Sequence, residues 1–157
     1  TNFSIYLPEY AGEDFPAATA REKNIAYSGT GTILIIDDER IVRTTSEGIL
    51  TACGFTVINA PNGEKGLELF RENSTRVRLV LLDMSMPDMS GLEAIRELRA
   101  VRKDVRILLS SGLGSDNRIN EAIKSGIDGF IEKPFSFNRL VRSVAGILGQ
   151  PPETNGH

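Results

Sequence analysis

The sequence contains few of the residues on which many catalytic and extracellular proteins depend. Cys53 is its only cysteine, and it has no tryptophan. A single cysteine excludes a disulfide framework and a cysteine zinc site, and it fits a reducing compartment. The only histidine is the last residue, His157. The chain therefore has no internal histidine to act as a catalytic base, a phosphodonor or part of a multi-histidine metal site.

Long apolar runs and an excess of positive charge are also missing. No run approaches the roughly 18 apolar residues that a membrane-spanning helix needs, so we expect no membrane contact and a cytoplasmic location. The net charge is −3 and the isoelectric point is near 5.3, whereas nucleic-acid-binding proteins show a basic patch. We see no secretory signal and expect the chain to start inside a longer protein.

The 157 residues suffice for one domain with a proper core, and the sequence pattern changes early in the chain. Residues 3–8, FSIYLP, alternate like a strand, but the stretch after them is rich in alanine, glycine and charge and has no period. We therefore expect residues 1–30 to be the end of a preceding domain plus a linker. Residues 31–149 form the predicted domain, and residues 150–157 a disordered tail.

From Thr32 onward, short β-branched apolar runs alternate with helical periodicity. The predicted strands cover 32–37, 55–60, 77–83, 105–111 and 128–133, and the predicted helices cover 39–53, 62–73, 91–102, 116–126 and 136–149. Five strands alternating with five helices predict βαβ units, and hence an α/β fold with a doubly wound parallel sheet. In such sheets, ligands bind outside the carboxyl ends of the strands.

Two helices carry further local signals. Asn62 is a predicted N-cap, because its side chain precedes a helical pattern. In the helix predicted over 39–53, the spacing of the apolar residues predicts a buried stripe. This stripe consists of Ile41, Thr45, Ile49 and Ala52.

Polar side chains collect where the predicted strands end. The first strand ends in Asp37 and Asp38, the third in Asp83, the fourth in Ser110 and Ser111, and the fifth in Lys133. Carboxylates that are packed together repel each other and need a cation. Oxygen ligands with few protein groups suit Mg²⁺ or Mn²⁺, which keep several waters. The strand ends therefore predict a divalent metal site.

The same groups suit phosphoryl transfer to a side chain. An aspartate carboxylate can act as a nucleophile and form an aspartyl-phosphate. The reaction otherwise needs charge neutralisation by a metal, an ammonium, and a hydroxyl or N–H group. The strand ends supply these groups as Asp37 and Asp38, Lys133, and Ser111. Asp83, which ends a strand so apolar that both its faces must be covered, is the predicted nucleophile.

Each of these residues also has an ordinary structural interpretation. An aspartate after a strand is more often a helix cap or a turn former than a nucleophile, and we expect that role for Asp88 and Asp116. Capping remains open for Asp38, because a helix begins next to it. Lys133 alone would be a solvated loop lysine, and the paired serines alone would form a turn. Only the convergence of groups from four strand ends favours chemistry.

Four motifs resemble the receiver domain of bacterial response regulators, the phosphoacceptor half of two-component signalling. They are ILIIDDE, LVLLDMSMPDMSG, ILLSSG and GFIEKPF, and the resemblance covers about residues 32–149. It implies a flavodoxin-like fold with the strand order 2-1-3-4-5. It also implies that Asp83 is phosphorylated and that Lys133 pairs with the phosphoryl group. The implied ligands of Mg²⁺ (or Mn²⁺) are Asp37, Asp38, Asp83 and the backbone carbonyl of Ser85.

The resemblance implies a conformational switch as well. Ser111 matches the hydroxyl residue that moves toward the phosphate, with Ser110 as the second choice, and Phe130 matches the switch aromatic. Since Phe130 has no hydroxyl, switching would depend on ring packing. Pro134 matches a proline that often follows a cis bond. Phosphorylation would shift a population of two conformers and alter an output face on the fourth helix, fifth strand and fifth helix, residues 115–148.

The implied partners lie outside this chain. The phosphodonor would be a histidine kinase or a histidine phosphotransfer domain, a downstream protein would bind the output face, and a dimer is among the expected assemblies. Residues 1–8, TNFSIYLP, resemble the closing strand of the ATP-binding domain of sensor histidine kinases. The chain thus resembles the C-terminal receiver of a bacterial hybrid sensor histidine kinase, and it would not be a kinase by itself.

Two other functions remain as alternatives. An Asp-nucleophile phosphohydrolase of the haloacid dehalogenase type places a second acid two residues after the nucleophile, but Asp83 is followed by Ser85 in that position. Such enzymes also carry a cap domain, for which this chain has no room. A pseudo-receiver that acts only as a docking module is disfavoured because every expected chemical group is present.

Overall fold

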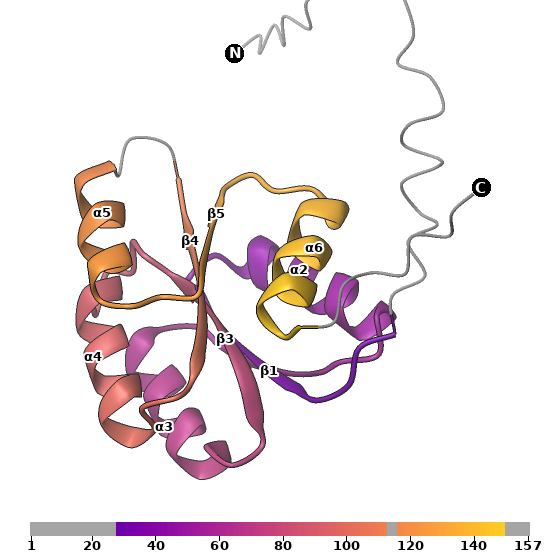
Figure 1. Ribbon diagram of the computed structural model, residues 1–157, viewed down its shortest axis with the longest axis horizontal. Helices are drawn as coiled ribbons and strands as arrows, with labels where there is room; N and C mark the ends of the chain where they lie inside the picture. Colours follow the sequence, from indigo (N-terminus) through magenta and orange to yellow (C-terminus); the bar gives the residue numbers. More distant parts are fainter. Residues whose placement is uncertain (1–27, 113–115, 150–157) are drawn as a thin grey trace, which may run out of the picture.

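The computed structural model describes residues 28–112 and 116–149, which form strands and helices in strict alternation (Figure 1). The strands are β1 (Thr32–Ile36), β2 (Thr56–Ala60), β3 (Val77–Asp83), β4 (Arg106–Ser111) and β5 (Gly129–Glu132). The helices are α2 (Arg40–Ala52), α3 (Gly63–Asn73), α4 (Gly91–Val101), α5 (Asp116–Lys124) and α6 (Phe137–Ile147). No helix in these ranges is long and apolar enough to cross a membrane. The predictions for residues 1–27 and 150–157 lie outside the described residues.

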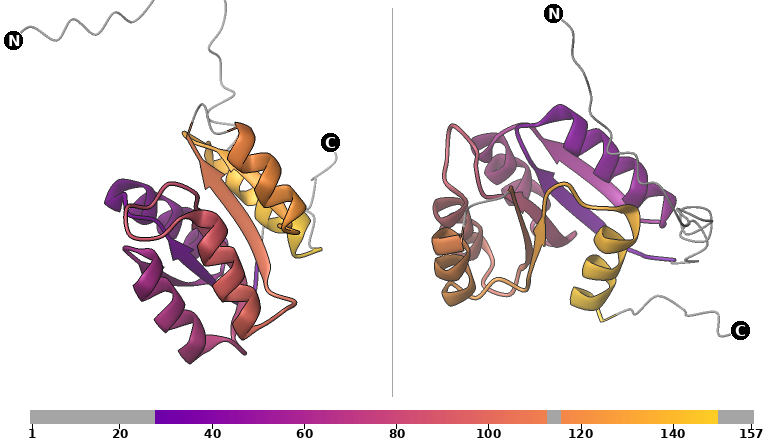
Figure 2. Two further views of the ribbon diagram at one scale, coloured as in Figure 1. Left: turned by 90° about the vertical axis from the view of Figure 1, so that its left-hand side faces the viewer. Right: turned by 90° about the horizontal axis from the view of Figure 1, so that it is seen from above.

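The five strands form one parallel sheet in the order β2-β1-β3-β4-β5, which confirms the predicted fold. Successive side chains of a strand point to opposite faces, so in β1 Ile33 and Ile35 enter one core layer and Leu34 and Ile36 enter the other. Helices α3, α4 and α5 cover one face of the sheet, and α2 and α6 cover the other (Figure 2). Because both faces are covered, polar side chains from several strands meet at the strand ends.

Side chains cap the start of α3. Asn62 Oδ1 accepts a hydrogen bond from the backbone N–H of Lys65 at 2.8 Å, which confirms its predicted N-cap role. The carboxylate of Asp88 accepts hydrogen bonds from the backbone N–H groups of Gly63 and Glu64. Asp88 is therefore a capping residue, as predicted, although it caps a helix that precedes it in the chain. This contact ties the loop after β3 to the start of α3.

The buried face of α2 differs from the predicted stripe. The buried residues of this helix are Ser46 and Leu50, whereas Ile41 is 80% exposed and Thr45 and Ala52 are also exposed. Of the predicted stripe only Ile49, which is partly buried, packs against the core, so the prediction was wrong by about one residue, or roughly 100° around the helix. The reason is the place of Ile41 in the first turn of α2, where it lines a pocket at the carboxyl end of the sheet and does not pack on the core.

Substitution by alanine should have opposite effects on stability at two helical glycines, Gly48 and Gly66. A Cβ at Gly66 would lie 2.5 Å from Cδ1 and 2.9 Å from Cγ2 of buried Ile36, whereas a Cβ at Gly48 meets nothing within 4 Å. Alanine is favoured over glycine in helices by about 1 kcal/mol, and overpacking costs about 1–3 kcal/mol. We expect Gly48→Ala to raise the free energy of unfolding by about 0.5–1 kcal/mol and Gly66→Ala to lower it by about 1 kcal/mol. Urea unfolding measures both, and equal stabilisation would contradict the close packing at Gly66.

Candidate functional site

Three carboxylates meet at the carboxyl end of the sheet. Strands β1 and β3 are neighbours, with Ile36 paired to Leu82, and the next residue along each strand direction is an aspartate. One carboxylate oxygen from each of Asp37, Asp38 and Asp83 lies within 4.8 Å of the other two. Asp37 and Asp83 are 2% and 3% exposed, whereas Asp38 is exposed. The N-cap residue of α2 is Glu39, so Asp38 does not take that position.

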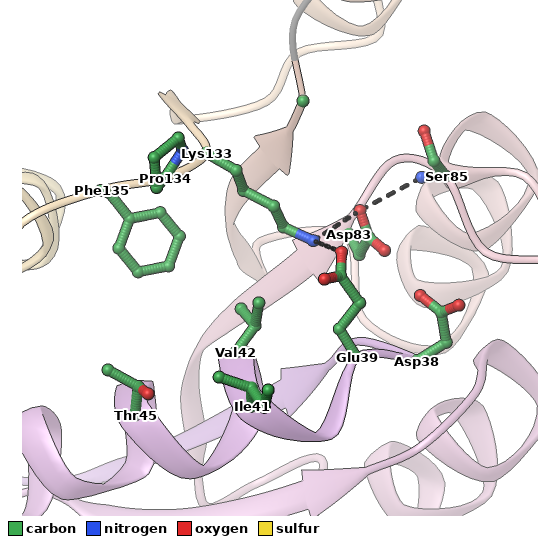
Figure 3. A pocket seen from close by; sticks show the side chains of 11 residues that line it. Asp38, Glu39, Ile41, Val42, Thr45, Asp83, Ser85, Lys133, Pro134 and Phe135 are labelled. Carbon is green, nitrogen blue, oxygen red and sulfur yellow. Dashed lines mark hydrogen bonds and ion pairs between the residues drawn. The ribbon is translucent and has the colours of Figure 1, made fainter. Parts of the chain in front are cut away.

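Lys133 brings a positive charge to this cluster from the end of β5. Its Nζ lies 2.8 Å from Oδ2 of Asp37 and 3.3 Å from Oδ1 of Asp83, and its side chain is only 12% exposed. A further carboxylate oxygen, Oε1 of Glu39, also lies 3.3 Å from Nζ (Figure 3). The peptide bond between Lys133 and Pro134 is cis, as the resemblance implied. Lys133 is therefore enclosed by carboxylates and is not a solvated loop lysine.

Burial and mutual charge perturb the titration of these groups. Burial, together with the charge of Asp37, raises the pKa of Asp83 to about 6, although the Lys133 ammonium opposes the rise. Burial also raises the pKa of Asp37. Burial acts to lower the pKa of Lys133, but the hydrogen bond and charge of Asp37 and the charge of Asp83 outweigh it and leave that pKa above its ordinary value. One ammonium does not balance the surrounding carboxylates, which favours a bound cation.

The donor set at this edge fits a hard divalent cation. It consists of carboxylate oxygens from Asp37, Asp38 and Asp83, and Mg²⁺ is commonly held by one or two carboxylates together with several waters. Ser85 lines the same pocket as Asp38, and its backbone N–H donates a hydrogen bond to Oδ1 of Asp83 at 3.2 Å. These residues are the ones that could hold a metal ion.

A pocket of about 560 Å³ opens over Asp83. Figure 3 shows a polar side with Asp38, Glu39, Asp83, Ser85 and Lys133, and a largely apolar side with Ile41, Val42, Thr45, Pro134 and Phe135. Sequence reasoning missed the role of Glu39 and this apolar side. Glu39 directly follows the aspartate pair, which was an available signal. Nothing in the helical period indicated the apolar side, because that period assigned Ile41 to the core.

The two serines at the end of β4 lie between β3 and β5 in the sheet order. Both are buried. The hydroxyl of Ser110 donates a hydrogen bond to the carbonyl oxygen of Leu82 at 3.4 Å, and that of Ser111 to the carbonyl oxygen of Gly112 at 3.2 Å. Neither serine is among the residues that line the pocket, so a role for Ser111 or Ser110 stays a prediction.

Phe130, the predicted switch aromatic, lies on β5 away from the pocket lining. Its ring is partly buried and packs against the core layer beneath α3, α4 and α5. It also lines a smaller groove between β5 and α6, together with Gly129 and Arg142. This position is compatible with a change in ring packing, and the switching role stays a prediction.

Comparison with known proteins adds independent evidence. The sequence model of the response regulator receiver domain matches residues 33–145. The chain is 34% identical over 156 residues to the sensor kinase CckA of Brucella abortus. This match covers 94% of the chain but only 16% of the length of CckA. The chain is also 34% identical over 113 residues to the chemotaxis protein CheY of Bacillus subtilis. This match covers 71% of the chain and 92% of that CheY. The CheX–CheY–BeF₃–Mg²⁺ complex of Borrelia burgdorferi matches with a TM-score of 0.71 and 25% identity, over 74% of this chain and 88% of that one.

The matched region contains the whole candidate site. It begins within β1 and ends within α6, so it includes the aspartate cluster and Lys133. Receiver domains generally bind Mg²⁺ at an acidic pocket and interact with histidine kinases or phosphotransfer proteins, and this chain has a cluster of three aspartates at the carboxyl end of its sheet. The chain belongs to the response regulator receiver family and is a receiver domain of two-component signalling.

Proposed function

We propose that Asp83 is the phosphoacceptor of this receiver domain. A carboxylate oxygen of Asp83 attacks the phosphorus of a phosphohistidine, the O–P bond forms as the P–N bond breaks, and the electron pair of the P–N bond stays on the imidazole nitrogen, which is protonated. The observation that carries the proposal is the contact of Lys133 with both Asp37 and Asp83 in an open pocket. This ammonium neutralises negative charge on the transferring group.

The metal in this proposal is Mg²⁺ or Mn²⁺. The residues that would hold it are Asp37, Asp38, Asp83 and the backbone carbonyl of Ser85. The ion supplies charge neutralisation for the phosphoryl oxygens when it is bound. The hydroxyl of Ser111 would donate a hydrogen bond to a phosphoryl oxygen, and Ser110, which is one register away along β4, is the second choice.

The proposed phosphodonor is a histidine kinase or a histidine phosphotransfer domain, on another domain or another chain. Its docking is supported by the apolar side of the pocket, because Ile41 is 80% exposed and lines the same pocket as the acceptor carboxylate. The proposed switch is a change in the packing of Phe130 that alters the face formed by α5, β5 and α6, within residues 115–148. A downstream protein, or a second copy of the domain, would bind that face.

The proposed setting is a bacterial hybrid sensor histidine kinase in the cytoplasm. The similarity to CckA extends over 94% of this chain, beyond the receiver region itself. In this proposal, residues 1–30 end a preceding ATP-binding domain and its linker, residues 31–149 are the receiver, and residues 150–157 are a tail. The chain would then catalyse only the transfer to its own aspartate.

Labelling with a small phosphodonor tests the proposed function. We expect incubation with acetyl phosphate and Mg²⁺ to add one phosphoryl group per chain, measured by intact-protein mass spectrometry, and a chelator to prevent the addition. A phosphohydrolase would instead turn over many substrate molecules, and a docking module would take up no label. Absence of label with saturating Mg²⁺ would therefore refute the proposal.

Removal of one metal-facing carboxylate should weaken metal binding. We expect Asp38→Asn to reduce Mg²⁺ affinity at least about tenfold, because even partners outside the ligand shell change metal affinity by about 10–100-fold. Isothermal titration calorimetry measures the dissociation constant. Asp104→Asn is the control, because Asp104 is exposed and pairs with Arg102 in the loop before β4, at the opposite end of that strand from the site. Equal affinity in the two variants would remove Asp38 from the proposed site.

A further inference from the structure

The turn between β1 and α2 carries two of the proposed metal ligands. It consists of residues 37–39, because β1 ends at Ile36 and α2 begins at Arg40. Asp37 is 2% exposed, whereas Asp38 is exposed. An exposed side chain has little packing around it, so the direction of the Asp38 carboxylate depends on the backbone that carries it. The contacts that hold this backbone therefore bear on metal binding.

Hydrogen bonds to the neighbouring elements hold the turn in place. The backbone N–H of Asp37 donates to the carbonyl oxygen of Ala60 in β2 at 3.2 Å, and Oδ1 of Asp37 accepts from the backbone N–H of Glu39 at 2.8 Å. The carbonyl oxygen of Asp37 accepts from Nη1 of Arg43 at 2.6 Å. That carbonyl belongs to the planar peptide unit that joins Asp37 to Asp38. The Arg43 contact thus fixes the peptide plane from which the Asp38 side chain extends.

The preferences of an isolated helix do not explain the placement of Arg43. It is the fourth residue of α2, and the first turn of this helix contains no acidic residue. The N-terminus of a helix carries a partial positive charge, which makes a cation near it unfavourable. The guanidinium instead makes a charge-assisted hydrogen bond to the turn, and such bonds are stronger than those between neutral groups. A local preference that is broken in this way is typical of a functional site.

We infer that Arg43 is a positioning residue for the metal site, because its hydrogen bond to the Asp37 carbonyl sets the direction of the Asp38 carboxylate. The inference rests on the proposed function, in which Asp38 holds the metal. Carboxylate oxygens of Asp37, Asp38 and Asp83 already lie within 4.8 Å of one another (Figure 3). Mg²⁺ demands near-ideal octahedral geometry, so a small rotation of one carboxylate is enough to weaken its binding.

Loss of the hydrogen bond and loss of the charge predict opposite changes in metal affinity. Removal of a positive charge near three carboxylates would by itself tighten the binding of a divalent cation. Removal of a group that orients a metal ligand weakens binding, commonly by about 10–100-fold. We expect Arg43→Met to raise the dissociation constant for Mg²⁺ at least about fivefold, measured by isothermal titration calorimetry. An unchanged or lower dissociation constant would overturn the inference.

Arg78→Met is the matched control. The guanidinium of Arg78 also donates a hydrogen bond to a backbone carbonyl, that of Thr30, at 2.8 Å. Arg78 is the second residue of β3 and Asp83 is the last, so about 16 Å of strand separates them. This separation exceeds the screening length at physiological salt. We expect the control to bind Mg²⁺ within about twofold of the wild type. Equal weakening in both variants would indicate a general effect on the fold and refute a specific role of Arg43.

A double-mutant cycle tests whether Arg43 acts through Asp38. In the Asp38→Asn background, we expect Arg43→Met to change the dissociation constant less than about twofold, because residues that act as a unit are not additive. A further loss of about fivefold in that background would place the effect of Arg43 elsewhere and reject the inference. Urea unfolding without metal checks that each variant is folded. If Arg43→Met is not folded, Arg43→Gln replaces it, because the neutral amide is two bonds shorter and cannot reach the carbonyl.

Labelling by acetyl phosphate separates metal binding from phosphoryl transfer. We expect Arg43→Met to need about fivefold more Mg²⁺ for half-maximal labelling, with a maximal rate within about twofold of the wild type. A loss of about tenfold in the maximal rate would assign Arg43 to the transfer itself and exclude a positioning role. Failure of the proposed function gives a different result. The wild-type chain would then take up no label, while calorimetry on Arg43→Met and Arg78→Met would still decide the role of Arg43.

Discussion

Replacement of Asp83 by asparagine is expected to abolish phosphoryl transfer to this chain. The amide has no negative charge and is a poor nucleophile toward phosphorus, while it keeps the shape of the carboxylate. Asp83 is 3% exposed at the end of β3, so the smallest change of volume is the safest test. We expect a loss of at least about a hundredfold in the initial rate of labelling, with no label detectable by intact mass.

Asp88→Asn is the matched control for this experiment. Asp88 lies in the loop that follows Asp83, and its carboxylate accepts hydrogen bonds from the start of α3. The asparagine oxygen can accept a hydrogen bond there, so the loop should keep its position. We expect this variant to label as the wild type does. Persistent labelling of Asp83→Asn would show that another carboxylate accepts the phosphoryl group.

The Asp83→Asn substitution is also expected to stabilise the metal-free domain at neutral pH. Burial and the charge of Asp37 raise the pKa of Asp83 from 3.8 to about 6 in the folded protein. Between pH 4 and pH 6 the folded state therefore binds a proton that the unfolded state has lost, so the free energy of unfolding falls as pH rises through this window. Each pKa unit corresponds to about 1.4 kcal/mol, which gives a maximum effect of about 3 kcal/mol.

Urea unfolding in the presence of a chelator measures this effect. We expect Asp83→Asn to be more stable than the wild type at pH 7 by up to about 3 kcal/mol, and the two proteins to be nearly equal at pH 4, where the carboxyl is protonated. Mg²⁺ at 100 times its dissociation constant should stabilise the wild type by about 2.7 kcal/mol. A variant that is less stable than the wild type at pH 7 without metal would contradict the destabilisation of the ionised Asp83 carboxylate by burial and by the charge of Asp37.

Local sequence signals predicted most of the fold. The apolar runs that became β1, β3 and β4 are buried on both faces, and continuous apolar runs of this length are typical of covered parallel strands. The start of α3 followed from Asn62, whose side chain accepts a hydrogen bond from the backbone N–H of Lys65 in the first turn of its own helix. The buried face of α2 was predicted wrongly, because Ile41 has the period of a core residue but lies beyond the packed layer.

The sequence by itself determined which chemical groups the domain has and that they stand at strand ends, because both properties depend on near neighbours in the chain. Only the tertiary structure decided which of these groups touch. The strand order brings Asp37 beside Asp83 and lets Lys133 reach both from β5. It also decided that Glu39 contacts the same ammonium from 94 residues away. Such contacts depend on sheet register and on the packing of distant loops, which no local period encodes.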